Sequence, residues 1–316
     1  MIIVCQQCKT QFHLDDNTVR QKQFLARCSR CGYVFQAYKQ NSAAKIPFLD
    51  LKLAKSTDCP KIIAVSNQKG GVAKTSSCLN IGASLAMDGK RVLLVDFDIQ
   101  ANLSISLGLR DKVSFYDTLK RGAKLTDLIL KTRYSNLWLI PSSKAMILLN
   151  KKYFNADNFE FILKDRLIQV QDQYDYILID TPPSIDLFTI NALTAAHTVV
   201  IPCQCDYLST HGVDQILKMI DMIKLKTNPR IEAKVLVTMF DDSSASSKVI
   251  RQKITDMYKE RAFKTIIDND AKMKEAQILS MPVMHYDKRS RAGVQYLALS
   301  RELLEEVEAR WANVAL

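Results

Sequence analysis

Short apolar, β-branched runs alternate along most of the chain with longer segments of helical periodicity. In VLLVD and YILID almost every position is apolar, which indicates strands buried on both faces, as in a parallel sheet covered by helices. The pattern therefore predicts an α/β fold with a mostly parallel sheet flanked by helices. The expected strands are residues 62–66, 91–96, 137–141, 176–180, 198–202 and 235–240, and the clearest expected helices are residues 75–87, 212–226 and 293–310.

The pattern changes before residue 61. Residues 1–39 contain paired cysteines and scattered aromatic residues. Residues 40–60 contain residues that break helices and strands and show no sustained periodicity, which is typical of a linker. The sequence therefore predicts a small N-terminal module (1–39), a linker (40–60) and one large α/β domain (61–316).

Composition narrows the class of protein. With 47% hydrophobic and 24% charged residues among 316, the chain has enough apolar side chains for a sizeable core. No apolar run reaches the roughly 18–20 residues that cross a bilayer, and the N-terminus lacks a basic leader, so we expect a soluble cytoplasmic protein. The net charge is +11, and the first 55 residues hold nine basic and three acidic side chains. This balance permits contact with an anionic polymer, although solvated basic surfaces are also common.

A glycine-rich turn joins the first predicted strand of the large domain to its first helix. A strand, such a turn and a helix start aim backbone N–H groups at phosphate oxygens. Lys74 is then expected to reach the β- and γ-phosphates, and the Thr75 hydroxyl to ligate Mg²⁺. An ordinary turn at Gly70-Gly71 is the alternative, and a second lysine just before the pair, Lys69, argues against it.

Acidic residues end two of the buried strands. Asp96 and Asp98 follow one of them, and Asp180 closes the four apolar residues of YILID, which is the Walker B pattern that holds Mg²⁺. Carboxylates at such positions are costly unless a cation or a nucleophilic water uses them. A solvent-exposed strand end is the alternative for the first pair.

These motifs together resemble the ParA and MinD family over nearly all of residues 61–310. The matching patterns are K-G-G-x-x-K-[ST] at 69–75, D-x-D-x-Q-x-N at 96–102 and D-T-P-P at 180–183, followed by similar segments at 201–207, 238–241 and 286–291. The resemblance implies an ATPase in which Lys69 crosses a dimer interface to the partner's ATP, Asp98 positions water and Asp96 supports the Mg²⁺ shell. It implies catalytic roles for Lys69, Lys74 and Asp98, nucleotide contacts for Lys69, Gly70, Gly71, Val72, Ala73, Lys74, Thr75, Ser76, Asp96, Asp180 and Met239, and Mg²⁺ contacts for Thr75, Asp98 and Asp180.

Several positions depart from the family pattern. Ala73 replaces a glycine before Lys74, and Asp268-Asn269-Asp270 replaces the P-R-N segment near adenine, which leaves the base contacts open. Ser243 stands where DNA-binding relatives carry an arginine. The expected DNA contacts are therefore Lys272, which the pattern keeps, with Lys248, Arg251 and Lys253 as compensating charges, and an ordinary solvated helix face is the alternative.

Four cysteines form C-x₂-C-x₁₉-C-x₂-C in the N-terminal module. Two such pairs complete a tetrahedral Zn²⁺ shell, and a module of this size needs a metal to fold because its core is small. Cys5, Cys8, Cys28 and Cys31 are therefore the predicted ligands of one structural Zn²⁺ in a zinc-ribbon-like module, with chance pairing or redox thiols as the alternative. Phe12, Phe24, Tyr33 and Phe35 are the expected packing residues.

The resemblance implies a partition ATPase with slow basal turnover. It would pair as a homodimer with ATP and Mg²⁺, bind nonspecific DNA on the nucleoid, and be switched by a ParB-like partner. The nearest alternative is the same enzyme positioning another cargo, such as a chemoreceptor array or a polar complex. A non-enzymatic zinc-ribbon regulator is the third. We expect no membrane contact, because the C-terminal RELLEEVEAR is too acidic for anionic lipid.

Overall fold

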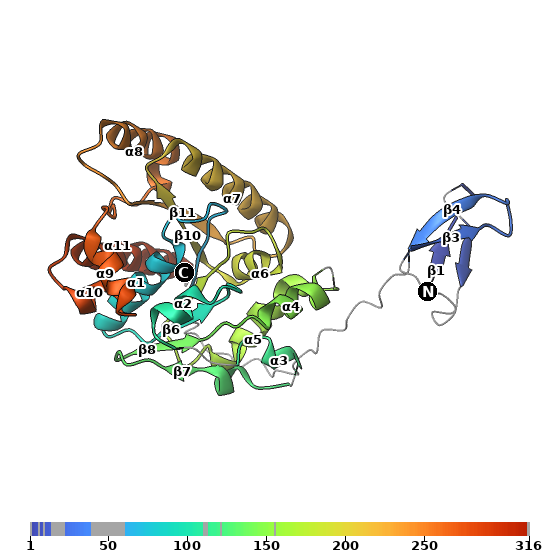
Figure 1. The fold of residues 1–316 in the computed structure, drawn as a ribbon, viewed down its shortest axis with the longest axis horizontal. Coiled ribbons are helices and arrows are strands. Elements are labelled where there is room, and N and C mark those ends of the chain that lie inside the picture. Colours follow the sequence, from blue (N-terminus) through green and yellow to red (C-terminus); the bar gives the residue numbers. More distant parts are fainter. Residues whose placement is uncertain are drawn as a thin grey trace. The chain divides into compact units, whose positions relative to one another are not determined.

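The computed structural model describes residues 2–5, 7–8, 10–13, 23–38, 61–109, 113–120, 122–154 and 156–314. The chain divides into a small N-terminal unit and a large unit, each with its own fold (Figure 1). The predicted linker, 40–60, lies outside the described residues, so the boundaries proposed for it stay predictions.

The N-terminal unit consists of two antiparallel strand pairs. Ile2 pairs with His13 at one end of the first, and Arg27 pairs with Val34 next to the turn of the second. The strands are β1 (Ile2–Val4), β2 (Gln11–His13), β3 (Gln23–Arg27) and β4 (Val34–Tyr38).

The large unit is built on one seven-stranded sheet, in the order β11-β10-β5-β9-β6-β8-β7. Every pairing is parallel except that of the short edge strand β7, so the predicted mostly parallel sheet is confirmed. All six predicted strands are present, with ends shifted by a few residues, and β7 is an addition. The strands are β5 (Lys61–Val65), β6 (Val92–Asp96), β7 (Leu130–Lys131), β8 (Leu137–Ile140), β9 (Tyr176–Asp180), β10 (Thr198–Gln204) and β11 (Glu232–Thr238).

Helices cover both faces of this sheet. The predicted helix 212–226 starts earlier in the structure, at Tyr207, because the Asp206 side chain caps it. The helices are α1 (Lys74–Met87), α2 (Asn102–Ser106), α3 (Asp117–Lys120), α4 (Met146–Tyr153), α5 (Ile162–Leu167), α6 (Leu187–Ala195), α7 (Tyr207–Lys226), α8 (Ala245–Tyr258), α9 (Ala271–Ile278), α10 (Val283–Tyr286) and α11 (Arg291–Val314), with 3-10 turns η1 (Leu125–Leu128), η2 (Phe159–Phe161), η3 (Ile168–Val170) and η4 (Lys259–Arg261). No helix within the described residues is both long and apolar enough to cross a bilayer.

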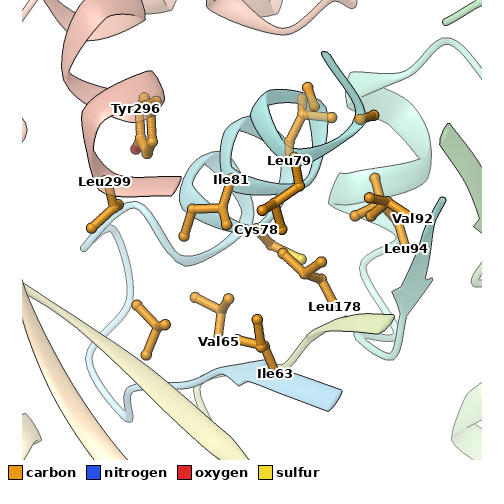
Figure 2. Close-up of a cluster of buried hydrophobic side chains, with 14 of the residues drawn as sticks. Ile63, Val65, Cys78, Leu79, Ile81, Val92, Leu94, Leu178, Tyr296 and Leu299 are labelled. Atoms are coloured by element: carbon orange, nitrogen blue, oxygen red, sulfur yellow. The ribbon is translucent and has the colours of Figure 1, made fainter. Parts of the chain in front are cut away.

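Alternate side chains of the buried strands enter two separate cores. On β10, Val200 joins the core beneath α1 and α11, while Val199 and Ile201 face the opposite core with residues of α7 and α8. Figure 2 shows the first core, where Ile81 of α1 lies between the strands and Tyr296 of α11. Two-sided burial explains why these strands are continuously apolar.

The carboxyl ends of the central strands meet at one edge of the sheet. Val65 and Asp96 both align with Asp180, so the ends of β5, β6 and β9 lie side by side. β5 has β10 on one side and β9 on the other, and its connection runs into α1. Open α/β sheets bind ligands outside such a carboxyl edge.

Candidate active site

The loop between β5 and α1 makes a tight bend at two left-handed residues. Gly71 has φ 77° and Ala73 has φ 67°. A Cβ added at Gly70 or Gly71 would meet no atom within 4 Å apart from those of the neighbouring residues in the chain, so the space beside these two glycines is open. α1 begins directly after Ala73 without a side-chain cap. This geometry suits an anion, because the first backbone N–H groups of a helix have no partner inside the helix.

Ala73 keeps the loop shape in spite of its methyl group. The left-handed conformation costs a non-glycine residue about 1–2 kcal/mol, and that cost explains why glycine is usual here. The rest of the loop holds the turn: Thr238 at the end of β11 donates its hydroxyl to the Val72 carbonyl at 3.2 Å. The departure noted in the sequence therefore strains the loop without unfolding it.

Lys74 lies buried at the start of α1, 8% exposed. Its ammonium donates to the Lys69 carbonyl oxygen at 2.8 Å. Burial holds the pKa of Lys74 below its usual value, and the charges of Asp180 and Asp98 oppose that shift. Lys74, the lysine predicted to bind phosphate, therefore lies close enough to Asp180 and Asp98 to interact with their charges.

Asp180 closes β9 with both carboxylate oxygens fully buried. Among the described residues no donor reaches hydrogen-bond geometry with either oxygen. Burial raises the pKa of Asp180 well above its usual range and Asp96 adds to the rise, whereas the nearby Thr75 hydroxyl lowers it. A buried carboxylate without donors is costly unless a cation balances it.

This arrangement fits a hard divalent cation. Carboxylate and hydroxyl oxygens are the ligands that Mg²⁺ prefers, usually beside phosphate oxygens of a bound nucleotide. Asp180 and Thr75 supply one of each beside the loop. These two residues would hold Mg²⁺, which would neutralise phosphate charge when bound. Asp98, the third predicted Mg²⁺ contact, is near enough for its charge to raise the pKa of Asp180, and its contact with the metal stays a prediction.

Asp96 has a different environment from Asp180. One of its oxygens accepts hydrogen bonds from the Ser104 backbone at 2.8 Å and the Ser104 hydroxyl at 2.6 Å, and the other accepts the Asp98 N–H at 3.3 Å. Burial raises its pKa to about 6. Asp96 therefore anchors the start of α2 and the segment that carries Asp98, which suits a supporting position around the metal shell rather than a direct ligand.

Asp98 lies beyond the end of β6 and is 5% exposed. One oxygen accepts the Gln100 backbone N–H at 2.9 Å. Burial raises the pKa of Asp98, and the Lys74 charge lowers it. The carboxylate therefore faces the charge of the phosphate lysine, as expected for a group that holds water near the reacting phosphate.

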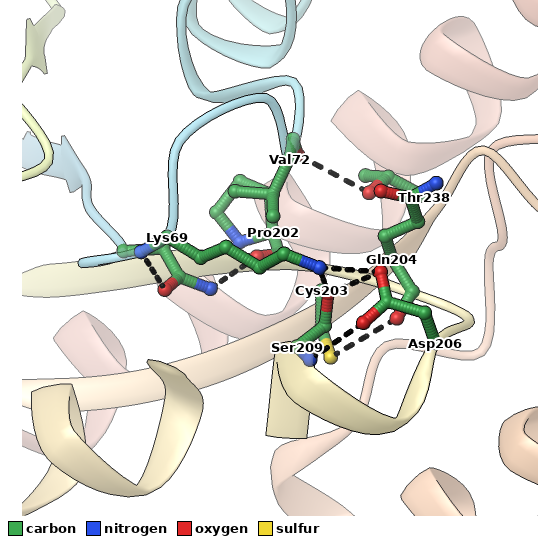
Figure 3. Close-up of polar contacts among 9 residues, drawn as sticks. Lys69, Val72, Pro202, Cys203, Gln204, Asp206, Ser209 and Thr238 are labelled. Carbon is green, nitrogen blue, oxygen red and sulfur yellow. Dashed lines mark hydrogen bonds and ion pairs between the residues drawn. The ribbon is translucent and has the colours of Figure 1, made fainter. Parts of the chain in front are cut away.

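Lys69 is engaged within its own chain. Its ammonium donates to Asp206 at 2.5 Å and to the Ser209 hydroxyl at 2.9 Å, at the start of α7 (Figure 3). Sequence reasoning did not find these partners. Residues 201–207 match a family pattern, but nothing in that pattern indicates a contact with a lysine more than a hundred residues away.

The segments expected near the base lie at the end of β11. Met239 has φ 52°, an uncommon conformation for a bulky residue that is typical of functional sites. Asp268 faces Arg291 at 3.4 Å, and Asp270 accepts the backbone N–H groups of Lys272 and Ala292. The two acids that replace the family's proline and asparagine therefore tie this segment to the starts of α9 and α11.

The basic residues predicted for DNA fall into different environments. Lys248 pairs with Asp242 at 3.4 Å, and Lys272 pairs with Glu275 at 2.8 Å. Arg251 is exposed and lies over the Phe240 ring, 5.3 Å from its centroid. Lys253 lies on another side of α8, in a shallow hollow of residues 249, 252, 253, 256 and 257. Arg251 is thus the predicted contact with the most available charge, since the described residues give it no ion pair.

The four N-terminal cysteines form a cluster. Their sulfur atoms all lie within 4.8 Å of one another, and the Sγ atoms of Cys5 and Cys31, and of Cys8 and Cys28, are 3.6 Å apart. A tetrahedral zinc with bonds of about 2.3 Å places its sulfurs roughly 3.8 Å apart, so the cluster fits Zn²⁺.

Little apolar packing supports this cluster. Its buried described residues are Cys5, Cys28 and Phe35. Tyr33, one of the expected packing residues, stacks on Phe35 with ring centroids 6.4 Å apart, although it stays 41% exposed. The side chains of Phe12 and Phe24 lie outside the described part of the structure.

Comparisons with known proteins cover both units. Residues 60–233 match a family described as an AAA domain, and residues 1–36 match a zinc-ribbon domain. The chain is 36% identical over 249 residues to the chromosome partitioning protein ParA of Myxococcus xanthus, covering 78% of this chain and 88% of the relative. It is 39% identical over 248 residues to the sporulation initiation inhibitor protein Soj of Bacillus subtilis, covering 77% and 98%. A cobyrinic acid a,c-diamide synthase from Mycobacterium smegmatis, solved with ADP and magnesium, superposes with a TM-score of 0.70 at 30% identity, covering 79% and 96%.

Proposed function

Because the chain belongs to the ParA/Soj family of partition ATPases, we propose that it binds ATP and Mg²⁺ at residues 69–76, pairs with a second copy and hydrolyses the nucleotide to move DNA. The observation that carries this assignment is Asp180, a fully buried carboxylate without a donor among the described residues, facing Lys74 at the loop. Such a pair fits a magnesium nucleotide and would be costly without one.

Each residue of the site has a distinct role in this proposal. The backbone of Gly70, Gly71, Val72 and Ala73 surrounds the phosphates, and Lys74 leaves the Lys69 carbonyl to donate to phosphate oxygens. Thr75 and Asp180 hold Mg²⁺, Ser76 lies in the first turn of α1, and Met239 borders the base. Asp98 accepts a hydrogen bond from water and orients it toward the γ-phosphate.

Asp98→Ala is expected to keep ATP affinity within about threefold while lowering the hydrolysis rate by about two orders of magnitude or more. The variant loses the carboxylate that orients water, and such groups contribute about 10²–10⁴-fold. Lys74 and the loop that hold the phosphates are unchanged. Nucleotide binding and phosphate release are measured on the same preparation.

Asp172→Ala is the matched control. It removes an exposed carboxylate that precedes the first residue of β9, whereas the site lies at the last residue of that strand. It should behave as wild type. An Asp98→Ala protein that hydrolyses ATP at the wild-type rate, with or without a stimulating partner, would remove Asp98 from the mechanism.

Pairing and partner control complete the proposal. Lys69 would reach the nucleotide of the partner subunit, so turnover would wait for pairing and stay slow in the isolated chain. A ParB-like protein would raise the rate. The zinc ribbon has a structural role in this proposal, because the geometry of its four cysteine sulfurs fits Zn²⁺. The presence of the ribbon favours a second candidate function, in which the same enzyme positions a different cargo that the ribbon recruits.

DNA contact is proposed for the face of α8 and the start of α9, which would place the dimer on the nucleoid. Arg251 is exposed there, while Lys248 and Lys272 have acidic neighbours that reduce their pull on phosphate. ATP should therefore raise DNA affinity, because pairing combines the weakly basic surfaces of two subunits. Each DNA phosphate that the protein neutralises contributes about −0.9 to the slope of log affinity against log salt concentration.

The double variant Arg251→Glu/Lys272→Glu is expected to lower ATP-dependent DNA affinity at least about tenfold and to flatten the salt slope. Arg251→Glu should have the larger effect of the two single changes. Fluorescence anisotropy with a nonspecific duplex at several salt concentrations measures both quantities.

Lys226→Glu/Arg230→Glu makes the same charge change near the amino-terminal end of β11 and is the control. Deleting residues 1–55 separates the two candidate surfaces. Binding that disappears with this deletion and ignores ATP would assign DNA to the ribbon. Absence of binding by the full chain at low salt with ATP would leave cargo positioning on another matrix.

A further inference from the structure

The ammonium of Lys69 lies between two side chains at the start of α7. It donates to one oxygen of Asp206 at 2.5 Å and to the Ser209 hydroxyl at 2.9 Å (Figure 3). The side chains of Lys69 and Asp206 are about one third exposed, so the pair can open. In the proposed function Lys69 contacts the nucleotide of the partner subunit, but in this structure it is bound within its own chain.

Asp206 also organises the helix that holds it. Its other oxygen caps α7 by accepting the Ser209 backbone N–H at 2.8 Å, while the oxygen facing Lys69 accepts the Ser209 hydroxyl at 2.9 Å. Both oxygens of one carboxylate are therefore used, one for the helix cap and one for the lysine. A substitution that keeps the cap and removes the charge can separate these two functions.

Close packing brings α7 to the loop. Gly212 lies against Asn67, and a Cβ at Gly212 would collide with the Asn67 side-chain oxygen. That same oxygen accepts the Lys69 backbone N–H at 3.0 Å, and the Asn67 amide donates to the Pro202 carbonyl at 2.7 Å. The backbone of Lys69 is thereby fixed at the distance from which its side chain reaches Asp206.

Lys69 also contacts Lys74, the other lysine of the loop. Its carbonyl oxygen accepts the Lys74 ammonium at 2.8 Å, while its own ammonium is held by Asp206. Each interaction is one that a nucleotide would replace, because phosphate oxygens compete for both ammonium groups. The two ammonium groups are therefore held by different acceptors, the Lys69 carbonyl and the Asp206 carboxylate.

We propose that Asp206 is a positioning residue that holds Lys69 in the unpaired subunit and competes with the partner's nucleotide for it. This inference rests on the proposed function, since it adds a requirement to ATP-dependent pairing: the contact between Lys69 and Asp206 must break first. Subunits pair when the phosphates of the partner's ATP replace the Asp206 carboxylate on Lys69. Asp206 then keeps its second role, the cap of α7.

Asp206→Asn tests the proposal because asparagine is close in size and is an equally good helix cap. Without nucleotide, Lys69 should be acetylated about threefold to tenfold faster by an N-hydroxysuccinimide ester, as followed by mass spectrometry. With ATP, half-maximal pairing should need about threefold to tenfold less protein, as for a charge-assisted bond at a partly exposed site. ATP affinity of the monomer should stay unchanged, since Lys74 is intact.

Asp206→Glu should restore slow acetylation, and Asp221→Asn, which removes an exposed charge from the same helix, should match wild type. Lys69 acetylation at the wild-type rate in Asp206→Asn would overturn the proposal, and so would weaker pairing. If neither wild type nor variant pairs with ATP, the proposed function fails. The acetylation ratio then decides by itself whether Asp206 holds Lys69.

Discussion

Lys74→Ala is expected to lower the affinity of the chain for ATP by about two orders of magnitude. The change removes the ammonium that would donate to phosphate oxygens, and charge-assisted hydrogen bonds contribute about 1.5–3 kcal/mol each. The fold should survive, because the change also removes a buried charge whose burial is unfavourable. Isothermal titration with ATP and Mg²⁺ measures the loss.

Thermal unfolding provides an independent measurement of the same effect. ATP at a hundred times its dissociation constant should stabilise the wild-type protein by about 2.7 kcal/mol and raise its Tm, whereas the variant should show almost no shift. Lys151→Ala, at an exposed position of α4, should retain the full shift. Equal shifts for wild type and Lys74→Ala would place the nucleotide elsewhere and remove the premise of the proposed mechanism.

Each part of this site that the sequence predicted lies within one short local pattern of the chain. Lys69 to Ser76 form one loop, and Asp96, Asp98 and Asp180 each follow an apolar run that ends at the same edge of the sheet. In each case the local pattern contains both the strand and the residue that follows it. Strand order, by contrast, depends on pairings between distant segments that no local pattern contains.

Two contacts that the sequence analysis missed differ in how far apart their residues lie in the chain. Asp206 is 137 positions from Lys69, so only the packing of α7 on the loop brings them together. The neutralising partner of Lys272 was three residues away, at a spacing where helical side chains meet, and could have been predicted from the sequence. The five-residue step from Lys248 to Lys253 likewise places the two lysines on different sides of α8.

Cys28→Ser is expected to release the zinc and unfold the N-terminal unit. Metal analysis of wild-type protein purified without added metal should give close to one zinc per chain, and the variant should give almost none. Cys205→Ser, a half-buried thiol of the large unit, is the control and should retain the metal. A variant that keeps a full equivalent of zinc would rule out this ligand set.

The size of this effect follows from how little else stabilises the ribbon. Of its three buried described residues, two are ligands themselves, and only Phe35 is an apolar side chain that would remain without metal. Structural zinc contributes about 10–16 kcal/mol in small modules at neutral pH, far more than one buried aromatic ring. The tryptophan-containing large unit has separate cores, so its unfolding transition and its ATP affinity should stay within error of wild type. Nuclear magnetic resonance of the variant should therefore show the signals of the ribbon strands collapse while those of the large unit persist.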